Sequence, residues 1–187
     1  EYKEKIEYCV QEVNRLNHLV DELLLLARFE NQRQNLKLEN VNLNSLLIDV
    51  VSRNSQAIKE QKLNCSTKFS KEISVKTDSY LFSIIINNLL TNAIKYSKKS
   101  SEIAVHLIEE NNKVQCSIID FGIGIAKEDM DKIFDQFYRS KNTHEGDIKG
   151  TGLGLSIVKR LCDLLEIDLK IESQENIGTK AILTFNQ

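Results

Sequence analysis

Glycine is distributed very unevenly along this chain. All seven glycines lie at or after Gly122, six of them lie between Gly122 and Gly154, and the chain contains no proline. Because glycine loses more conformational entropy on folding than any other residue, a chain that concentrates it in one segment needs special backbone geometry there. We therefore look for the chemistry of this protein between residues 122 and 154.

Length and composition restrict the class of protein. A chain of 187 residues that is 41% hydrophobic can bury a real core and form one domain with a small addition. The net charge is −2 and there is no polybasic run, which argues against binding to nucleic acid or to a membrane surface. The longest apolar stretch, Leu23–Ala27, is too short to span a bilayer, and the N-terminus is typical of an amphipathic helix rather than a signal peptide. The four cysteines show no metal-ligand or redox spacing, which predicts reduced thiols in a cytosolic protein.

Residues 1–30 carry a seven-residue apolar repeat. Its members alternate three and four positions apart: Ile6, Cys9, Val13, Leu16, Val20, Leu23 and Ala27. This spacing favours a helix of a bundle or coiled coil over an ordinary helix packed on its own domain. The polar segment 31–35 is interpreted as a hinge, so we expect a helical piece at 1–33 and a second domain at 34–187.

The rest of the chain alternates between helical and strand patterns. We expect helices from Asn42 or Asn44 to residue 61 and over 78–96, 126–133 and 152–165. Strands are expected at 36–41, 63–69, 73–76, 102–109, 113–119, 168–173 and 179–185. This mixture predicts an α+β two-layer sandwich, in which helices cover one face of a mixed, mainly antiparallel sheet.

The apolar helix expected over 78–96 carries a polar line. Asn88, Asn92 and Lys95 lie at i, i+4 and i+7, on one face. Asparagine is a poor helix former, so a solvated stripe and a functional site are both open interpretations. In the functional interpretation the amide oxygens bind Mg²⁺ and Lys95 meets a phosphate.

Two glycine-containing segments follow. Asp120-Phe-Gly122-Ile-Gly124-Ile125 comes directly after a strand, so its carboxylate can accept a hydrogen bond from an exocyclic amine such as that of adenine; a simple tight turn is the alternative. Gly150-Thr151-Gly152-Leu153-Gly154 opens a helix, whose N–H groups and dipole favour a phosphate. The polar segment 138–149 before it carries Arg139 and Lys141 and is interpreted as a mobile lid or as a disordered surface loop.

The order of these segments resembles the histidine kinase branch of the superfamily that also holds gyrase B, the Hsp-type chaperones and MutL, the GHKL or Bergerat-fold proteins. Residues 88–96 are similar to its N box, residues 120–124 to its first glycine box and residues 134–139 to its F box. Residues 150–155 resemble its second glycine box, and Gly178-Thr179 fits the small glycine box near the end. The resemblance covers residues 35–187 closely, and residues 1–30 look like the second helix of the dimerisation domain.

The resemblance implies an ATP-binding site with Mg²⁺. In it Asp120 contacts the adenine amino group, Asn92 with Asn88 holds the metal, Lys95 and Tyr96 face the phosphates, and Arg139 or Lys141 reaches them from the lid. The catalytic residues implied are Asn88, Lys95 and Arg139. The implied nucleotide-binding set is Asn88, Asn92, Lys95, Tyr96, Asp120, Gly122, Gly124, Ile125, Phe137, Arg139, Lys141, Gly150, Thr151, Gly152, Leu153, Gly154 and Thr179.

The resemblance also implies a reaction, the transfer of the ATP γ-phosphoryl group to a histidine nitrogen. Hydrolysing relatives carry a glutamate where this chain has Asn88, which cannot act as a base at neutral pH. None of His18, His106 and His144 lies in the usual acceptor box, so the acceptor helix is expected outside this fragment. The expected context is the cytoplasmic portion of a membrane-anchored, homodimeric sensor with a response regulator as partner. A stand-alone ATPase, a non-catalytic docking module and a protein-serine kinase are the alternatives.

Overall fold

The computed structural model describes residues 36–111, 113–140 and 150–186. It also describes part of the N-terminal segment, namely Tyr2, Lys5, Ile6, Cys9, Val10, Val13, Leu16, Asn17, Val20 and Leu24. The chain divides into two compact units, Glu1–Leu36 and Lys37–Gln187. The hinge expected at 31–35 lies outside the described residues.

In the first unit the described residues from Tyr2 to Leu24 are helical. The described apolar residues of the repeat are largely exposed: Ile6 by 62%, Val13 by 55%, Leu16 by 60% and Val20 by 52%. Leu23, Ala27 and His18 lie outside the described residues. The N-terminal helix therefore presents an apolar stripe that its own unit does not bury.

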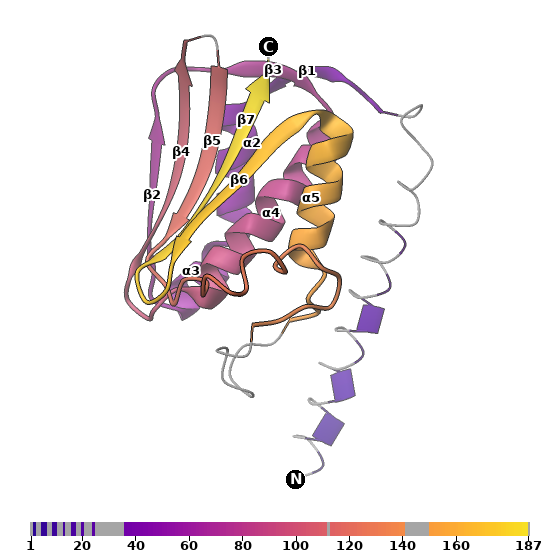
Figure 1. The fold of residues 1–187 in the computed structure, drawn as a ribbon, viewed down its shortest axis with the longest axis vertical. Coiled ribbons are helices and arrows are strands. Elements are labelled where there is room, and N and C mark those ends of the chain that lie inside the picture. The colour runs from indigo at the N-terminus through magenta and orange to yellow at the C-terminus, as the bar shows by residue number, and fades with distance from the viewer. Residues whose placement is uncertain are drawn as a thin grey trace. The chain divides into compact units, whose positions relative to one another are not determined.

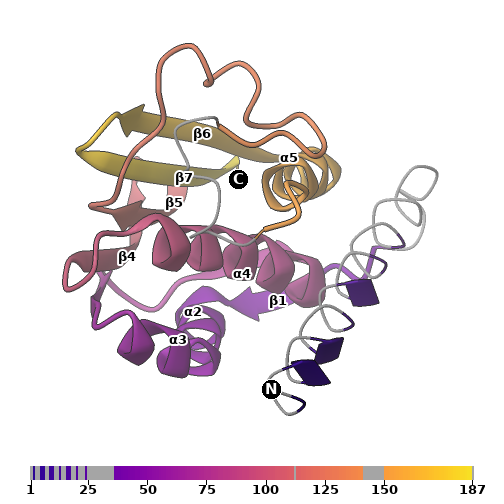
Figure 2. The ribbon, with the colours of Figure 1, turned by 90° about the horizontal axis from the view of Figure 1, so that it is seen from below.

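The second unit has two layers (Figures 1 and 2). One layer is a five-stranded sheet in the order β2-β4-β5-β7-β6, in which β2 and β4 are parallel and the other neighbours antiparallel. Its strands are β2 (Asn64–Phe69), β4 (Glu102–Glu110), β5 (Lys113–Asp120), β6 (Ile167–Gln174) and β7 (Gly178–Asn186). The mixed, mainly antiparallel sheet confirms the predicted fold class.

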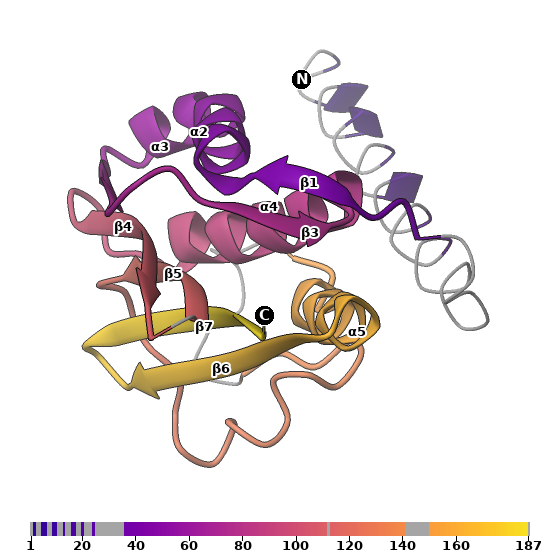
Figure 3. The ribbon, with the colours of Figure 1, turned by 90° about the horizontal axis from the view of Figure 1, so that it is seen from above.

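Helices cover one face of this sheet. They are α2 (Leu43–Arg53), α3 (Ser55–Glu60), α4 (Ser79–Tyr96) and α5 (Gly154–Leu165). A small antiparallel pair, β1 (Glu39–Asn42) with β3 (Ser74–Thr77), lies beside α2 and α4 (Figure 3). The core lies between the layers, where Phe82 of α4 packs against Phe185 of β7 with ring centroids 5.2 Å apart.

Helix α4 forms where its sequence predicts it. The Asp78 carboxylate caps the helix by accepting a hydrogen bond from the Leu81 N–H at 3.1 Å. Its second oxygen accepts from the Lys37 N–H at 3.0 Å, which ties the start of the unit to this cap. The buried stripe that includes Ile85, Ile86 and Leu90 then holds the helix on the sheet.

Two predicted helices are wrong in detail. The helix expected to run to residue 61 breaks at Asn54, because its amide Nδ2 donates to the Val50 carbonyl at 2.9 Å and to Asn87 of α4 at 3.0 Å. The helix expected at 126–133 is instead a series of turns over 127–134. Of this segment and the preceding residue, only Ala126 and Asp129 are buried, so there is no apolar stripe on which a helix could pack.

The described cysteines are free thiols. Cys116 of β5 and Cys162 of α5 are buried, and burial raises the pKa of each thiol to about 12. His106 is a residue of strand β4, within the strand expected at 102–109. In the part of the chain that the structure describes, no helix has both the length and the apolar composition of a membrane-spanning segment.

Candidate functional site

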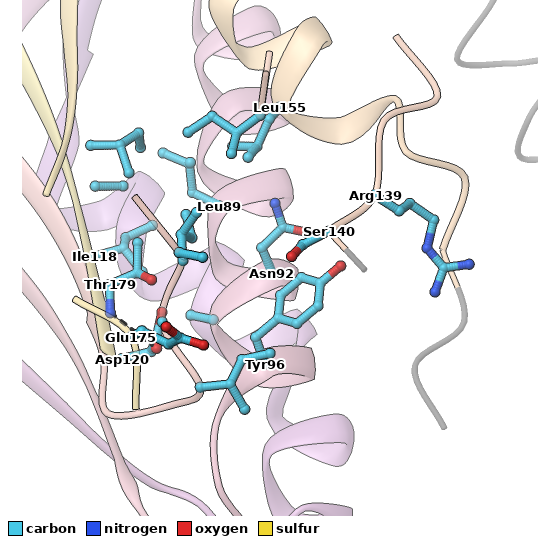
Figure 4. A pocket seen from close by; sticks show the side chains of 18 of the residues that line it. Leu89, Asn92, Tyr96, Ile118, Asp120, Arg139, Ser140, Leu155, Glu175 and Thr179 are labelled. Carbon is cyan, nitrogen blue, oxygen red and sulfur yellow. Dashed lines mark hydrogen bonds between the residues drawn. The ribbon is translucent and has the colours of Figure 1, made fainter. Parts of the chain in front are cut away.

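A cavity of about 310 Å³ lies between helix α4 and the sheet (Figure 4). Its wall comes from α4, from the end of β5 with the loop after it, and from strands β6 and β7 with the turn between them. Ile133, residues 138–140 and Leu155 of α5 complete it. The lining residues that the sequence singles out are Asn92, Tyr96, Asp120, Gly124, Ile125, Arg139 and Thr179.

Asp120 is the last residue of β5 and faces the helical layer. Its side chain is only 8% exposed, and its Oδ1 accepts hydrogen bonds from the N–H groups of Gly122 at 2.9 Å and Thr179 at 3.3 Å. Asp120 and Thr179 are register partners on β5 and β7, which explains how residues so distant in sequence meet. Burial raises the pKa of Asp120 to about 6, although the two backbone hydrogen bonds act in the opposite direction.

The loop after Asp120 is held against its surroundings by backbone contacts. The Ile123 N–H donates to the Tyr96 carbonyl at 3.1 Å, and the Asn176 N–H donates to the Ile123 carbonyl at 2.6 Å. Gly124 has a φ of +66°, and a Cβ there would lie 2.1 Å from the Gln174 carbonyl oxygen. The glycine is therefore required both by its backbone conformation and by this close approach.

The polar line on α4 faces the glycine-rich segment before α5. A Cβ at Gly154 would lie 3.0 Å from Oδ1 of Asn88, and one at Gly150 would lie 3.9 Å from Nζ of Lys95. Asn88 Nδ2 donates to the Ile84 carbonyl at 3.0 Å within its own helix. Asn88 and Lys95 thus lie beside the glycine segment, although they do not line the cavity itself.

The N-terminus of α5 lacks a side-chain cap among the described residues. Leu153 takes the N-cap position with helical dihedral angles, and its own N–H donates to Thr151 Oγ1 at 3.3 Å. The first N–H groups of a helix have no partner inside it, and together with the helix dipole they favour an anion. The end of α5 next to Asn88 therefore suits a phosphate.

The two ends of the segment interpreted as a lid are joined. The Phe137 N–H donates to the Gly152 carbonyl at 3.0 Å, and Phe137 itself has a φ of +64°. Gly152 has a φ of +76°, and a Cβ there would lie 2.8 Å from the Phe137 carbonyl carbon. Lys141 and the rest of the segment up to residue 149 lie outside the described residues.

Arg139 lines the cavity at its rim. In Figure 4 its side chain extends away from Asn92 and Tyr96. Its charge nevertheless lowers the pKa of Tyr96, against the larger upward effect of burial. The guanidinium is therefore close enough to act electrostatically on the α4 side of the site.

Several residues of the predicted set lie outside the cavity wall. Asn88, Lys95, Gly150 and Gly154 lie at the adjoining phosphate end, and the Gly122 N–H donates to Asp120. Phe137, Thr151, Gly152 and Leu153 are joined to one another by hydrogen bonds just before α5: Phe137 to Gly152, and Leu153 to Thr151. Phe137 is 56% exposed and Leu153 is fully buried. Phe137 and Leu153 therefore contribute to the site through the backbone.

Sequence reasoning missed part of the wall. Tyr138, Ser140, Glu175 and Asn176 line the cavity. Glu175 and Asn176 belong to the turn between β6 and β7. Their closeness in sequence to Gly178-Thr179 is the signal from which they could have been predicted. Tyr138 and Ser140 lie in the segment interpreted as a lid, but no sequence pattern marked them individually, because their contacts with Asp129 form only in the folded chain.

The donor set suits a hard divalent cation. The described residues contain no group of three or more His, Cys, Asp or Glu side chains placed to hold a metal. The Asn88 and Asn92 amides instead lie next to Gly154, where the absent side chain leaves room beside Asn88 Oδ1. Mg²⁺ is bound in proteins by few protein oxygens together with substrate phosphates, so this sparse oxygen set fits it.

Fold and site together define a class of protein: a two-layer α+β domain with a buried acceptor at one end of a cavity and a helix N-terminus at the other. Residues 77–187 match the model of a family described as histidine kinase-, DNA gyrase B- and HSP90-like ATPases. The chain belongs to this family. Its relatives place it among the ATP-binding catalytic domains of sensor histidine kinases.

Three comparisons illustrate this placement. The sensor protein RprX of Bacteroides fragilis is 33% identical over 177 residues, which cover 92% of this chain and 34% of RprX. Full-length ShkA in complex with AMPPNP superposes with a TM-score of 0.82 at 23% identity, over 93% of this chain and 36% of ShkA. The histidine kinase ThkA in complex with the response regulator protein TrrA gives a TM-score of 0.75 at 22% identity, over 92% of this chain and 48% of that one. The chain thus spans about a third of the curated relative RprX.

Proposed function

We propose that this chain is the ATP-binding kinase domain of a two-component sensor histidine kinase, and that it transfers the ATP γ-phosphoryl group to a histidine on a helix outside this sequence. One observation carries the proposal. The buried Asp120 carboxylate lies at one end of the cavity, and the line of Asn88, Asn92 and Lys95 meets the glycine-rich start of α5 at the other. A hydrogen-bond acceptor for a base and a helix N-terminus for a phosphate, both beside one cavity, suit a purine nucleotide.

Asp120 would select the base. Its Oδ1 accepts from the Gly122 and Thr179 N–H groups, which leaves Oδ2 as the oxygen without a hydrogen bond among the described residues. A carboxylate is an acceptor only, so it matches the exocyclic amino group of adenine and disfavours the carbonyl that guanine carries there. Thr179 and Gly124 would hold the base in place from the sheet side.

Asn92, with Asn88, would hold Mg²⁺ through amide oxygens, and Lys95 and Tyr96 would face the phosphates. A bound Mg²⁺ would neutralise phosphate charge that the protein alone meets with few cations. The N–H groups at the start of α5 would bind the phosphate oxygens, and Arg139, or Lys141 beyond the described residues, would approach from the other side. Such a site works by positioning and charge stabilisation, since phosphoryl transfer asks little covalent chemistry of the protein.

Asn88 argues for transfer over hydrolysis. Its Nδ2 is committed to the Ile84 carbonyl, and an amide oxygen is too weak a base to activate water at neutral pH. The acceptor in this proposal is a protein histidine. The partners would be the acceptor helix of the complete kinase, which would be a homodimer, and a response regulator such as the one bound to ThkA. Residues 1–33 would be the remnant of the dimerisation domain and 34–187 the catalytic domain, in the cytoplasmic part of a membrane-anchored sensor.

Calorimetric titration with the non-hydrolysable analogue AMP-PNP, with and without Mg²⁺, tests the proposal. We expect metal-dependent binding that weakens by at least about ten-fold in Asp120→Asn, which replaces an acceptor by a donor amide, and in Asn92→Ala. Asp131→Asn is the matched control, because it removes the same charge from an exposed position away from the cavity. A folded, unmodified chain that binds no AMP-PNP would contradict the kinase proposal and favour a docking module.

A further inference from the structure

Asp129 is a buried carboxylate that the proposed reaction does not use. It lies in the turn segment 127–134 and is only 9% exposed. Its Oδ1 accepts a hydrogen bond from the Tyr138 hydroxyl at 2.6 Å, and its Oδ2 accepts one from the Ser140 hydroxyl. Burying a carboxylate is unfavourable unless it is well hydrogen-bonded, and these two contacts stabilise the buried Asp129 side chain.

The two donors flank Arg139. Tyr138, Arg139 and Ser140 all line the cavity, and Figure 4 labels Arg139 and Ser140 in its wall. One carboxylate therefore fixes the chain on both sides of the arginine. Moving the Arg139 backbone away from the cavity requires the loss of at least one of these charge-assisted hydrogen bonds.

Independent backbone contacts hold the chain just before this point. The Phe137 N–H is bonded to Gly152, and the Tyr138 N–H donates to the Asp135 carbonyl at 3.3 Å. Residues 137 and 138 are therefore anchored from the α5 side and from the turn segment, and Asp129 extends this anchoring through residue 140. The backbone of Arg139 is thus fixed at the cavity, from which the charge of its guanidinium acts on Tyr96 of α4.

We propose that Asp129 is a positioning residue that holds residues 138–140 in place, so that the backbone of Arg139 is already fixed at the cavity before a nucleotide binds. The inference rests on the proposed function. A cation whose backbone is already held in place loses less conformational entropy when a nucleotide binds. The loss of Asp129 should therefore weaken binding of the phosphates. The base is held on the sheet side by Asp120 and Thr179, and its binding should not depend on Asp129.

The test compares AMP-PNP with Mg²⁺, by calorimetry, and adenosine, by an NMR titration suited to weaker binding. We expect Asp129→Ala to weaken AMP-PNP binding by about ten-fold, the scale of one lost charge-assisted hydrogen bond, and to leave adenosine binding unchanged. Asp129→Asn should restore most of the affinity, because its amide can still accept from Tyr138 and donate to Ser140. Glu128→Gln is the control, since it removes the same charge from the exposed neighbour.

A double-mutant cycle separates positioning from a merely structural role. In an Arg139→Ala background, Asp129→Ala should cause no further loss of AMP-PNP affinity, because the residue through which it acts is absent. An equal loss in both backgrounds, or an equal loss for adenosine, would overturn the proposal. If Asp129→Ala does not fold, Tyr138→Phe removes one of the two hydrogen bonds and is subject to the same criteria. A wild-type chain that binds adenosine but not AMP-PNP would contradict this inference, and one that binds neither would contradict the proposed function.

Discussion

Asp120 combines a useful position with an unfavourable environment. Its pKa is raised to about 6 because burial disfavours the ionised form. The unfolded chain would ionise this carboxyl near the model value of 3.8, and the folded chain near 6. The folded state therefore binds the proton more tightly. The contribution of Asp120 to stability is fully present below pH 3.8 and is lost as the pH rises to about 6.

The ionised Asp120 side chain should therefore lower the free energy of unfolding at neutral pH. We expect Asp120→Asn to raise the free energy of unfolding at pH 7, by up to about 3 kcal/mol, because the neutral amide oxygen can still accept from Gly122 and Thr179. The difference should shrink as the pH is lowered from 6 to 4. Urea unfolding of both proteins across this pH range measures it, and a variant less stable than the original chain at pH 7 would contradict the predicted cost of the buried charge.

Among the elements, local sequence predicted most of the regular structure. Helix α4, the hairpin of β4 with β5 and the hairpin of β6 with β7 all form within one or two residues of their predicted bounds. Each has a local cause: a cap at Asp78 with an apolar period, or alternation around a short turn. The errors have non-local causes. Asn54 breaks a helix partly by bonding to Asn87 of another helix, and the turns at 127–134 lack an apolar face to bury.

The loop from β5 to the turn segment should be sensitive to side chains at one glycine. We expect Gly124→Ala to destabilise the protein by about 2–4 kcal/mol, since it adds the strain of a left-handed conformation to a clash with the Gln174 carbonyl. Gly150→Ala is the matched control, because among the described residues the nearest atom to its new Cβ is Lys95 Nζ at 3.9 Å. Urea denaturation midpoints at constant slope measure both. Equal stability of the two variants would show that the loop adapts at no cost.

At the scale of the whole molecule, the two units differ in how far their apolar residues are exposed. Lys37–Gln187 buries its apolar residues between two layers, whereas the described apolar residues of the N-terminal helix remain about half exposed or more. An exposed apolar stripe of this kind marks a surface made for other helices. That residues 1–33 come from a dimerisation domain stays a prediction.

Self-association of the chain tests this surface. We expect weak association at high protein concentration, and we expect the combined change Val13→Glu and Leu16→Glu to abolish it, because charges would enter the apolar stripe. Asn17→Glu adds a charge to the same helix at a residue outside the repeat and should have no such effect. Sedimentation velocity measures all three proteins, and an unmodified chain that stays monomeric at high concentration would refute the prediction.

The sequence by itself determined the local features: which segments are helices or strands, where glycine is required, and which short motifs carry acceptors, amides and cations. These depend on side-chain period, caps and turn chemistry, which act over a few residues. Only the tertiary structure decided which of them meet. Asp120 receives its hydrogen bond from Thr179 through strand register, Asn88 faces Gly154 through packing of α4 near α5, and Asp129 reaches Tyr138 and Ser140 through a fold of the chain that no local pattern marks. The first two contacts arise from the packing of distant segments around one core, and the third from a turn of the chain back on itself, so none of them is encoded in the local pattern of one helix or strand.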